Sequence, residues 1–72
     1  MKVLLDSVDK VRRFAHIARS LDTGVYVQSG RFTVDGKSIM GLFSLDLLQA
    51  LTVEFDEPKE EYEKAFWQLA VE

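Results

Sequence analysis

Residues 25–34 read VYVQSGRFTV, and this stretch decides the fold. Apolar and polar side chains alternate in 25–28 and again in 31–34, which is the pattern of two half-buried strands. Between them, Ser29-Gly30 is a two-residue turn signal. The stretch therefore predicts a β-hairpin in the middle of the chain.

The segments before the hairpin predict a strand and a helix. Residues 2–5 are short and apolar, which suits a first strand. Asp6 and Ser7 are then two candidate N-caps for a helix over residues 8–21. Its apolar positions recur at spacings of three and four, as one helix face requires; they are Val8, Val11, Phe14, Ala15, Ala18 and Leu21.

The segments after the hairpin predict a short helix, a strand and a last helix. Ser38 can cap one or two helical turns, followed by a loop. Residues 50–56 alternate like a half-buried strand. Pro58 suits the first turn of a helix, where its missing N–H costs nothing. The apolar positions of this last helix are Tyr62, Ala65, Phe66, Leu69 and Ala70.

These segments predict one domain over residues 1–72, in the order β-α-β-β-α-β-α. Four short strands and amphipathic helices favour an α+β sandwich, with the helices covering one face of the sheet. The expected core comprises Val11, Phe14, Ala18, Val25, Val27, Leu51, Val53, Phe55, Phe66 and Leu69.

The composition of the chain limits the kinds of partner and the cellular compartment that we expect. The chain has no cysteine, which favours a reducing, cytoplasmic setting. A net charge of −3 argues against nucleic acid as a partner. Apolar runs are too short for a membrane span of about 20 residues or for a signal peptide. Charge is uneven, however, since residues 1–37 carry seven Lys/Arg and four Asp/Glu, and residues 38–72 carry two and eight.

Catalysis has little support in the sequence. The chain has one histidine, and no residues suggest a cofactor or a metal site. Gly36-Lys37-Ser38 matches the end of a phosphate-binding P-loop, but Arg31 stands where the pattern needs another glycine. The acidic residues between 56 and 63 lack the spacing of a calcium loop and indicate a solvated helix face. We therefore expect a protein that is not an enzyme.

Two surface features point to a protein partner. Arg12, His16 and Arg19 lie at i, i+4 and i+7 on the side of helix 8–21 away from its apolar face. They form either a solvated basic face or a docking stripe for an acidic partner. The second feature is the segment 38–43, whose short helix has more large apolar side chains than it can bury. Either the loop 44–49 covers them or some are exposed for contact.

Residues 36–45 read GKSIMGLFSL, and they resemble the regulatory serine region of HPr, the histidine-containing phosphocarrier protein of the bacterial sugar phosphotransferase system. The order of helices and strands also resembles that family along almost the whole chain. The resemblance implies an open-faced β-sandwich, with four antiparallel strands and helices on one side, in a bacterial cytoplasmic protein.

The resemblance fails at the family's phosphoryl-accepting site. That site is His-x-Arg-Pro at the start of the first helix, where this chain has Ser7-Val8-Asp9-Lys10. His16 comes nine residues after Ser7, more than two helical turns away, and cannot substitute for the missing histidine. An aspartate at position 9 would also repel a phosphate. We therefore expect no phosphocarrier activity.

The resemblance holds on the regulatory side. Ser38 matches a serine that a dedicated kinase phosphorylates in some members, although a plain N-cap role would also explain it. The implied function is a regulatory protein-binding module that Ser38 controls. The implied partner is a phosphotransferase-system protein or a transcriptional regulator. The implied partner-binding residues are Arg12, His16, Arg19, Ile39, Met40 and Phe43. The alternative is a small interaction or ligand-binding α+β domain unrelated to sugar transport.

Overall fold

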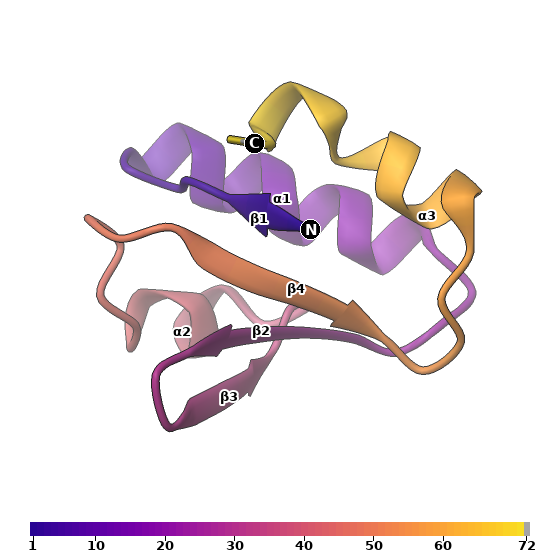
Figure 1. Cartoon of the computed structure of the whole chain (residues 1–72). Helices are drawn as coiled ribbons and strands as arrows, with labels where there is room; N and C mark the ends of the chain where they lie inside the picture. The colour runs from indigo at the N-terminus through magenta and orange to yellow at the C-terminus, as the bar shows by residue number, and fades with distance from the viewer. Residues whose placement is uncertain (72) are drawn as a thin grey trace.

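The computed structural model describes residues 1–71, and its elements follow the expected order (Figure 1). The α-helices of the described residues are α1, α2 and α3, and a 3-10 turn, η1, follows α3. The bounds are β1 Lys2–Val3, α1 Val8–Ser20, β2 Val25–Ser29, β3 Phe32–Asp35, α2 Ile39–Phe43, β4 Leu51–Phe55, α3 Glu60–Ala65 and η1 Trp67–Leu69.

The four strands form one antiparallel sheet in the order β1-β4-β2-β3. The hairpin of β2 and β3 is confirmed, but its turn is shifted by one residue. Ser29 pairs with Phe32, so the loop is Gly30-Arg31 rather than Ser29-Gly30. Gly30 has a φ of 58°, whereas that of Arg31 is not positive. This combination is typical of a type II′ turn, which requires glycine first.

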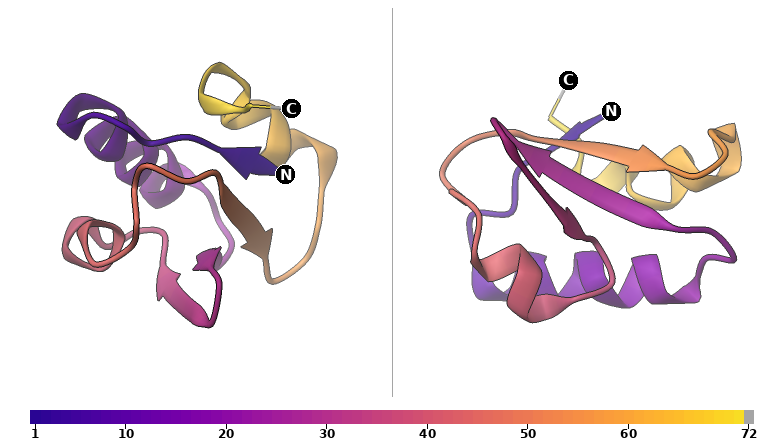
Figure 2. Two further views of the ribbon diagram at one scale, coloured as in Figure 1. Left: turned by 60° about the vertical axis from the view of Figure 1, so that its left-hand side comes forward. Right: turned by 90° about the horizontal axis from the view of Figure 1, so that it is seen from below.

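The two faces of the sheet differ in exposure. Val25, Val27 and Val53 are buried on one face. Their neighbours Tyr26 and Glu54, which pair with each other, are exposed on the opposite face. Helices α1 and α2 lie on the same side of the sheet (Figure 2, right). The α+β open-faced β-sandwich expected from the sequence is therefore confirmed.

The core lies between the sheet and the helices. The Phe14 ring of α1 stacks on the Phe66 ring, with the centroids 4.5 Å apart, and Phe55 lies 6.1 Å from Phe66. Every core residue expected from the sequence is buried except Phe55, which is half-buried. Phe55 ends its strand, and its ring also contacts Tyr62, with the centroids 5.6 Å apart.

The first strand is shorter than the expected range 2–5, and the C-terminal segment accounts for the difference. Beyond Val3, the Leu4 N–H donates to the Leu69 carbonyl at 3.2 Å. The Val71 N–H donates to the Lys2 carbonyl at 3.0 Å, and Val3 forms a bridge with Ala70. Residues 69–71 therefore cover the outer edge of β1, and the two described ends of the chain lie side by side (Figure 1).

The last helix begins at Glu60, two residues after Pro58, which the sequence analysis placed in its first turn. Lys59 is still extended, at φ −137° and ψ 141°, and caps the helix without a side-chain bond. The residue before a proline is itself excluded from helical geometry, which keeps Glu57 outside the helix as well. The helix ends at Ala65, and η1 then brings Leu69 into the core.

Candidate functional site

Ser38 starts the short helix α2, as its sequence position predicts. Its backbone is extended, and its Oγ accepts a hydrogen bond from the Gly41 N–H at 3.0 Å. The Ser38 carbonyl accepts from the Leu42 N–H at 3.0 Å, which closes the first helical turn. Ser38 is half-buried, so its hydroxyl has a defined structural role as an N-cap.

The side chains of α2 divide between the core and the solvent. Leu42 is fully buried, and Ile39 packs against the core while half-buried. Met40 is 82% exposed and Phe43 is 43% exposed. The loop 44–49 therefore leaves both of these side chains accessible. Five helical residues cannot direct all their apolar side chains inward, which is the reason the sequence analysis gave for expecting exposure here.

Helices α1 and α2 lie side by side, and two basic side chains join them. The Arg19 Nε near the end of α1 donates to the Lys37 carbonyl at 2.8 Å. The Lys37 Nζ in turn donates to the Leu21 carbonyl at 3.2 Å. Arg19 therefore also fixes the residue that precedes Ser38, a role that its helical spacing alone could not reveal.

The other two members of the basic stripe, Arg12 and His16, are exposed on α1. Among residues 1–71, the side-chain ion pairs involve Lys10, Arg13 and Lys64, and neither Arg12 nor His16 takes part in one. Both side chains are therefore accessible to a partner. The structure brings their helix beside α2, which carries the apolar residues of the candidate surface.

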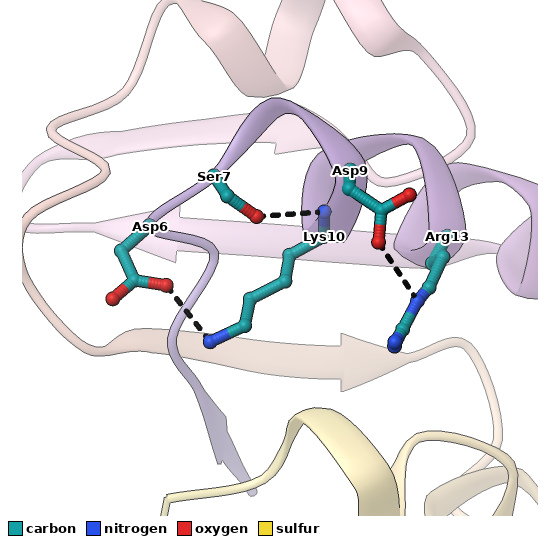
Figure 3. Close-up of polar contacts among 5 residues, drawn as sticks. All are labelled: Asp6, Ser7, Asp9, Lys10 and Arg13. Carbon is teal, nitrogen blue, oxygen red and sulfur yellow. Dashed lines mark hydrogen bonds and ion pairs between the residues drawn. The ribbon is translucent and has the colours of Figure 1, made fainter.

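The start of α1 has acidic side chains around it (Figure 3). The Ser7 Oγ accepts from the Lys10 N–H at 3.1 Å and caps the helix. Asp6 pairs with the Lys10 ammonium at 2.8 Å, and Asp9 pairs with Arg13 at 3.4 Å. The hydrogen bond from Lys10 lowers the pKa of the Asp6 carboxyl. The Asp6 carboxylate therefore stays ionised beside the helix N-terminus at neutral pH.

An open groove of about 260 Å³ connects the start of α1 to the end of α2. Phe43 lines it together with residues from both sides. The other lining residues are Leu5, Asp6, Ser7, Val8, Leu47 and Leu48. The groove therefore extends the accessible apolar surface from Phe43 towards the N-terminus of α1.

Part of this apolar surface is not predicted by the sequence. Val8 belongs to the apolar face that the sequence predicts for its helix, but it is exposed and lines the groove. Leu48 is exposed as well, whereas Leu47 packs partly against the core. The adjacent pair Leu47-Leu48 in a loop was the available signal, since two neighbouring side chains there cannot both reach the core.

The part of the chain that the structure describes holds no group of three His, Cys, Asp or Glu side chains placed to bind a metal ion. In the same part, no helix combines the length and apolar character that a membrane span requires. The candidate site is the accessible surface over α1, α2 and the groove between them.

Comparison with known proteins identifies the architecture. No protein-family model matches the chain, and no curated protein matches its sequence. Among solved structures, the chain is similar to the crystal structure of HPr-C-His from Thermoanaerobacter tengcongensis. The TM-score is 0.80 and the identity 21%, over 94% of this chain and 85% of that one. The fold is HPr-like. At this identity the likeness concerns the fold, which agrees with the resemblance noted around Ser38.

Proposed function

We propose that this chain is an HPr-like regulatory module of the sugar phosphotransferase system, which binds a protein and does not carry phosphate on histidine. The observation behind the proposal is the accessible apolar surface of α2, above all Met40 at 82% exposure. A large apolar side chain beside other exposed apolar residues is typical of protein contacts.

The proposed contact surface has an apolar centre and a basic rim. Ile39, Met40 and Phe43 form the centre, and Arg12, His16 and Arg19 form the rim. Buried apolar anchors supply most of the binding energy in such interfaces, while charges at the rim mainly increase the association rate. An acidic partner surface is therefore the expected match.

The start of α1 supports the absence of phosphocarrier activity. A phosphohistidine there would need a histidine at the helix N-terminus and neighbours that stabilise its negative charge. Ser7 stands at that N-terminus, with the carboxylates of Asp6 and Asp9 beside it. Negative charge beside the helix N-terminus opposes a phosphate there.

Ser38 is the proposed point of control. A phosphate on its Oγ would replace the hydroxyl that now caps α2 and would add about two negative charges. Those charges would lie next to the apolar centre that an acidic partner is proposed to contact. Phosphorylation is therefore expected to weaken binding.

The binding proposal is tested by a pull-down from the native host with three baits. Wild type and Trp67→Asp should recover the same partner, and Met40→Asp should lose it. Trp67 is the matched control, because it is 61% exposed but belongs to η1 rather than α2. Equal recovery by all three baits would contradict this location of the binding site.

The same pull-down separates the proposal from its alternative. A partner from the phosphotransferase system, such as a sugar permease, or a transcriptional regulator of sugar transport supports the proposed function. A partner unrelated to sugar transport supports instead an interaction domain that shares only the fold. The Ser38→Asp variant then tests control, since it should reduce recovery of whichever partner is found.

The phosphocarrier part of the proposal needs a separate experiment. The protein is incubated with phosphoenolpyruvate and the first enzyme of the phosphotransferase relay, with a phosphocarrier HPr as positive control. Mass spectrometry should detect no acid-labile phosphate on this chain under conditions that label the control. Stoichiometric phosphohistidine at His16 would overturn this part.

A further inference from the structure

The two edges of the sheet are not equally protected. Residues 69–71 cover the outer edge of β1 with backbone hydrogen bonds. The other edge is β3, Phe32–Asp35, and no described segment pairs with its outer side. The view of Figure 2 (right) looks onto β3, and no other segment lies in front of it. Such an edge is a template for another strand.

The pairing of the hairpin shows which backbone groups of β3 point outward. Phe32 and Val34 pair with Ser29 and Val27 next to a two-residue loop, and in such a hairpin these are the hydrogen-bonded pairs. The bond from the Gly36 N–H to the Val25 carbonyl, at 2.7 Å, continues the same alternation. The N–H and C=O of Thr33 and the N–H of Asp35 therefore point away from the sheet.

β3 is short, with four residues, but it lacks several of the usual protections against edge pairing. It has no proline and no lysine, and no bulge interrupts its register with β2. Phe32 is 71% exposed, although Val34 on the same side of the strand is half-buried against α2. The exposed Phe32 ring on this unpaired strand is therefore available for contact with another molecule.

The charges and side chains of β3 complement a second copy of the same strand. In an antiparallel pairing centred on Thr33, the two Thr33 residues face each other and exchange both outward hydrogen bonds. Each Arg31 then lies opposite Asp35 of the second copy, and each Phe32 lies opposite Val34. Opposite charges, facing threonines and an aromatic with a β-branched residue are all favourable cross-strand pairs.

The neighbouring register centred on Val34 is worse. It would place Thr33 opposite Asp35 and leave Phe32 opposite Gly36, which has no side chain. Asp35 already accepts from the Lys37 N–H at 2.9 Å through one oxygen, and its carboxylate has further acceptor positions for an arginine. The Thr33 register is therefore the one that satisfies both the backbone and the charges.

From this geometry we infer that β3 is a homodimer edge, at which two copies of the chain join their sheets antiparallel about Thr33. The arrangement is isologous, so every cross-strand pair occurs twice. One short strand per copy covers less than the area of stable interfaces, so the dimer is weak and forms only at high protein concentration. The surface is separate from the one proposed for the protein partner on α1 and α2.

The test measures the mass of the protein in solution by sedimentation equilibrium, up to about 1 mM, where weak interfaces of this size assemble. Wild type should show a monomer–dimer equilibrium. Thr33→Pro removes an outward N–H without touching the bonds to β2, and it should reduce association at least tenfold. Circular dichroism checks that each variant is folded.

A charge exchange tests the register itself. Arg31→Asp gives each copy two carboxylates at the edge, and Asp35→Arg gives each copy two guanidinium groups. Neither variant alone should dimerise, whereas an equimolar mixture of the two should form a heterodimer, because every charged pair is then opposite in sign. Loss of association in the mixture, or a wild type that stays monomeric at about 1 mM, would overturn the inference. Unchanged association of both single variants would place the dimer contact on another surface and overturn it as well.

Discussion

Helices α1 and α2 both begin at a serine N-cap, but the charges beside the two serines differ. Each has a serine N-cap in extended conformation, whose Oγ accepts from the N–H three residues on, at 3.1 Å for Ser7 and 3.0 Å for Ser38. The charges around the two serines are different. Asp6 and Asp9 flank the first, whereas no acidic residue lies in the first turn of α2.

The two helices also differ in how deeply they are anchored. Helix α1 has 13 residues, and its buried side chains are Val11, Phe14, Ala15 and Ala18. Helix α2 has five residues and buries only Leu42. An N-cap therefore fixes where a helix starts and does not reveal the role of the helix. One of these helices builds the core, and the other presents side chains to the solvent.

The largest expected effect tests the difference in anchoring. Phe14→Ala should lower the free energy of unfolding by about 3–5 kcal/mol, because it empties a buried site against Phe66. Leu42→Ala should cost less, about 2–3 kcal/mol, because a short surface helix can collapse into part of the cavity. Urea denaturation measures both. A larger loss for Leu42→Ala would show that α2 is as integral to the core as α1.

A smaller effect compares the two caps directly. Ser7→Ala and Ser38→Ala should each lower the free energy of unfolding by about 1 kcal/mol, since each leaves one helix N–H without its acceptor. The loss of each cap should affect a different length of helix. Amide hydrogen exchange should rise only in the first turn of α1 for Ser7→Ala, but throughout α2 for Ser38→Ala. Equal spread in both helices would remove the distinction.

The smallest effect concerns the charges at the start of α1. Lys10→Met should raise the pKa of Asp6 towards its ordinary value, because the hydrogen bond from the Lys10 ammonium is the main cause of the lowered pKa. A lowered pKa in the folded state contributes stability above the unfolded-state pKa of about 3.9, and that stability is lost as the pH falls through the folded-state value. Carboxyl NMR titration measures the change. An unaltered Asp6 pKa would show that the pair is not maintained in solution.

The sequence predicted the elements better than their ends. Periodicity identified α1, the hairpin and β4, because alternating and helical patterns follow directly from burial on one face. The position of the hairpin loop is not predicted to the residue, because both Ser29-Gly30 and Gly30-Arg31 contain the glycine that the turn needs. The late start of α3 is not predicted either, because proline is favourable in a first helical turn but also fits the extended backbone that continues here through Lys59.

For the candidate site, the sequence predicted exposure but not contacts. Counting apolar side chains on a short helix was enough to expect that some of Ile39, Met40 and Phe43 are accessible. The groove beside Val8 depends on where two distant segments meet, and no local pattern contains that information. The same holds for the bond from Arg19 to the Lys37 carbonyl, which joins residues 18 positions apart.

The bridge between Val3 and Ala70 has a consequence for the order of folding. It joins residues from nearly opposite ends of the described chain, so forming it early would close a very long loop, at an entropic cost that grows with loop length. The β2–β3 hairpin needs only a two-residue loop, and hairpins form within about 1–10 μs. We therefore expect the rate-limiting transition state to contain the β2–β3 hairpin with α2 packed against β3. Strand β1 and residues 69–71 should pair afterwards, as the last step of folding.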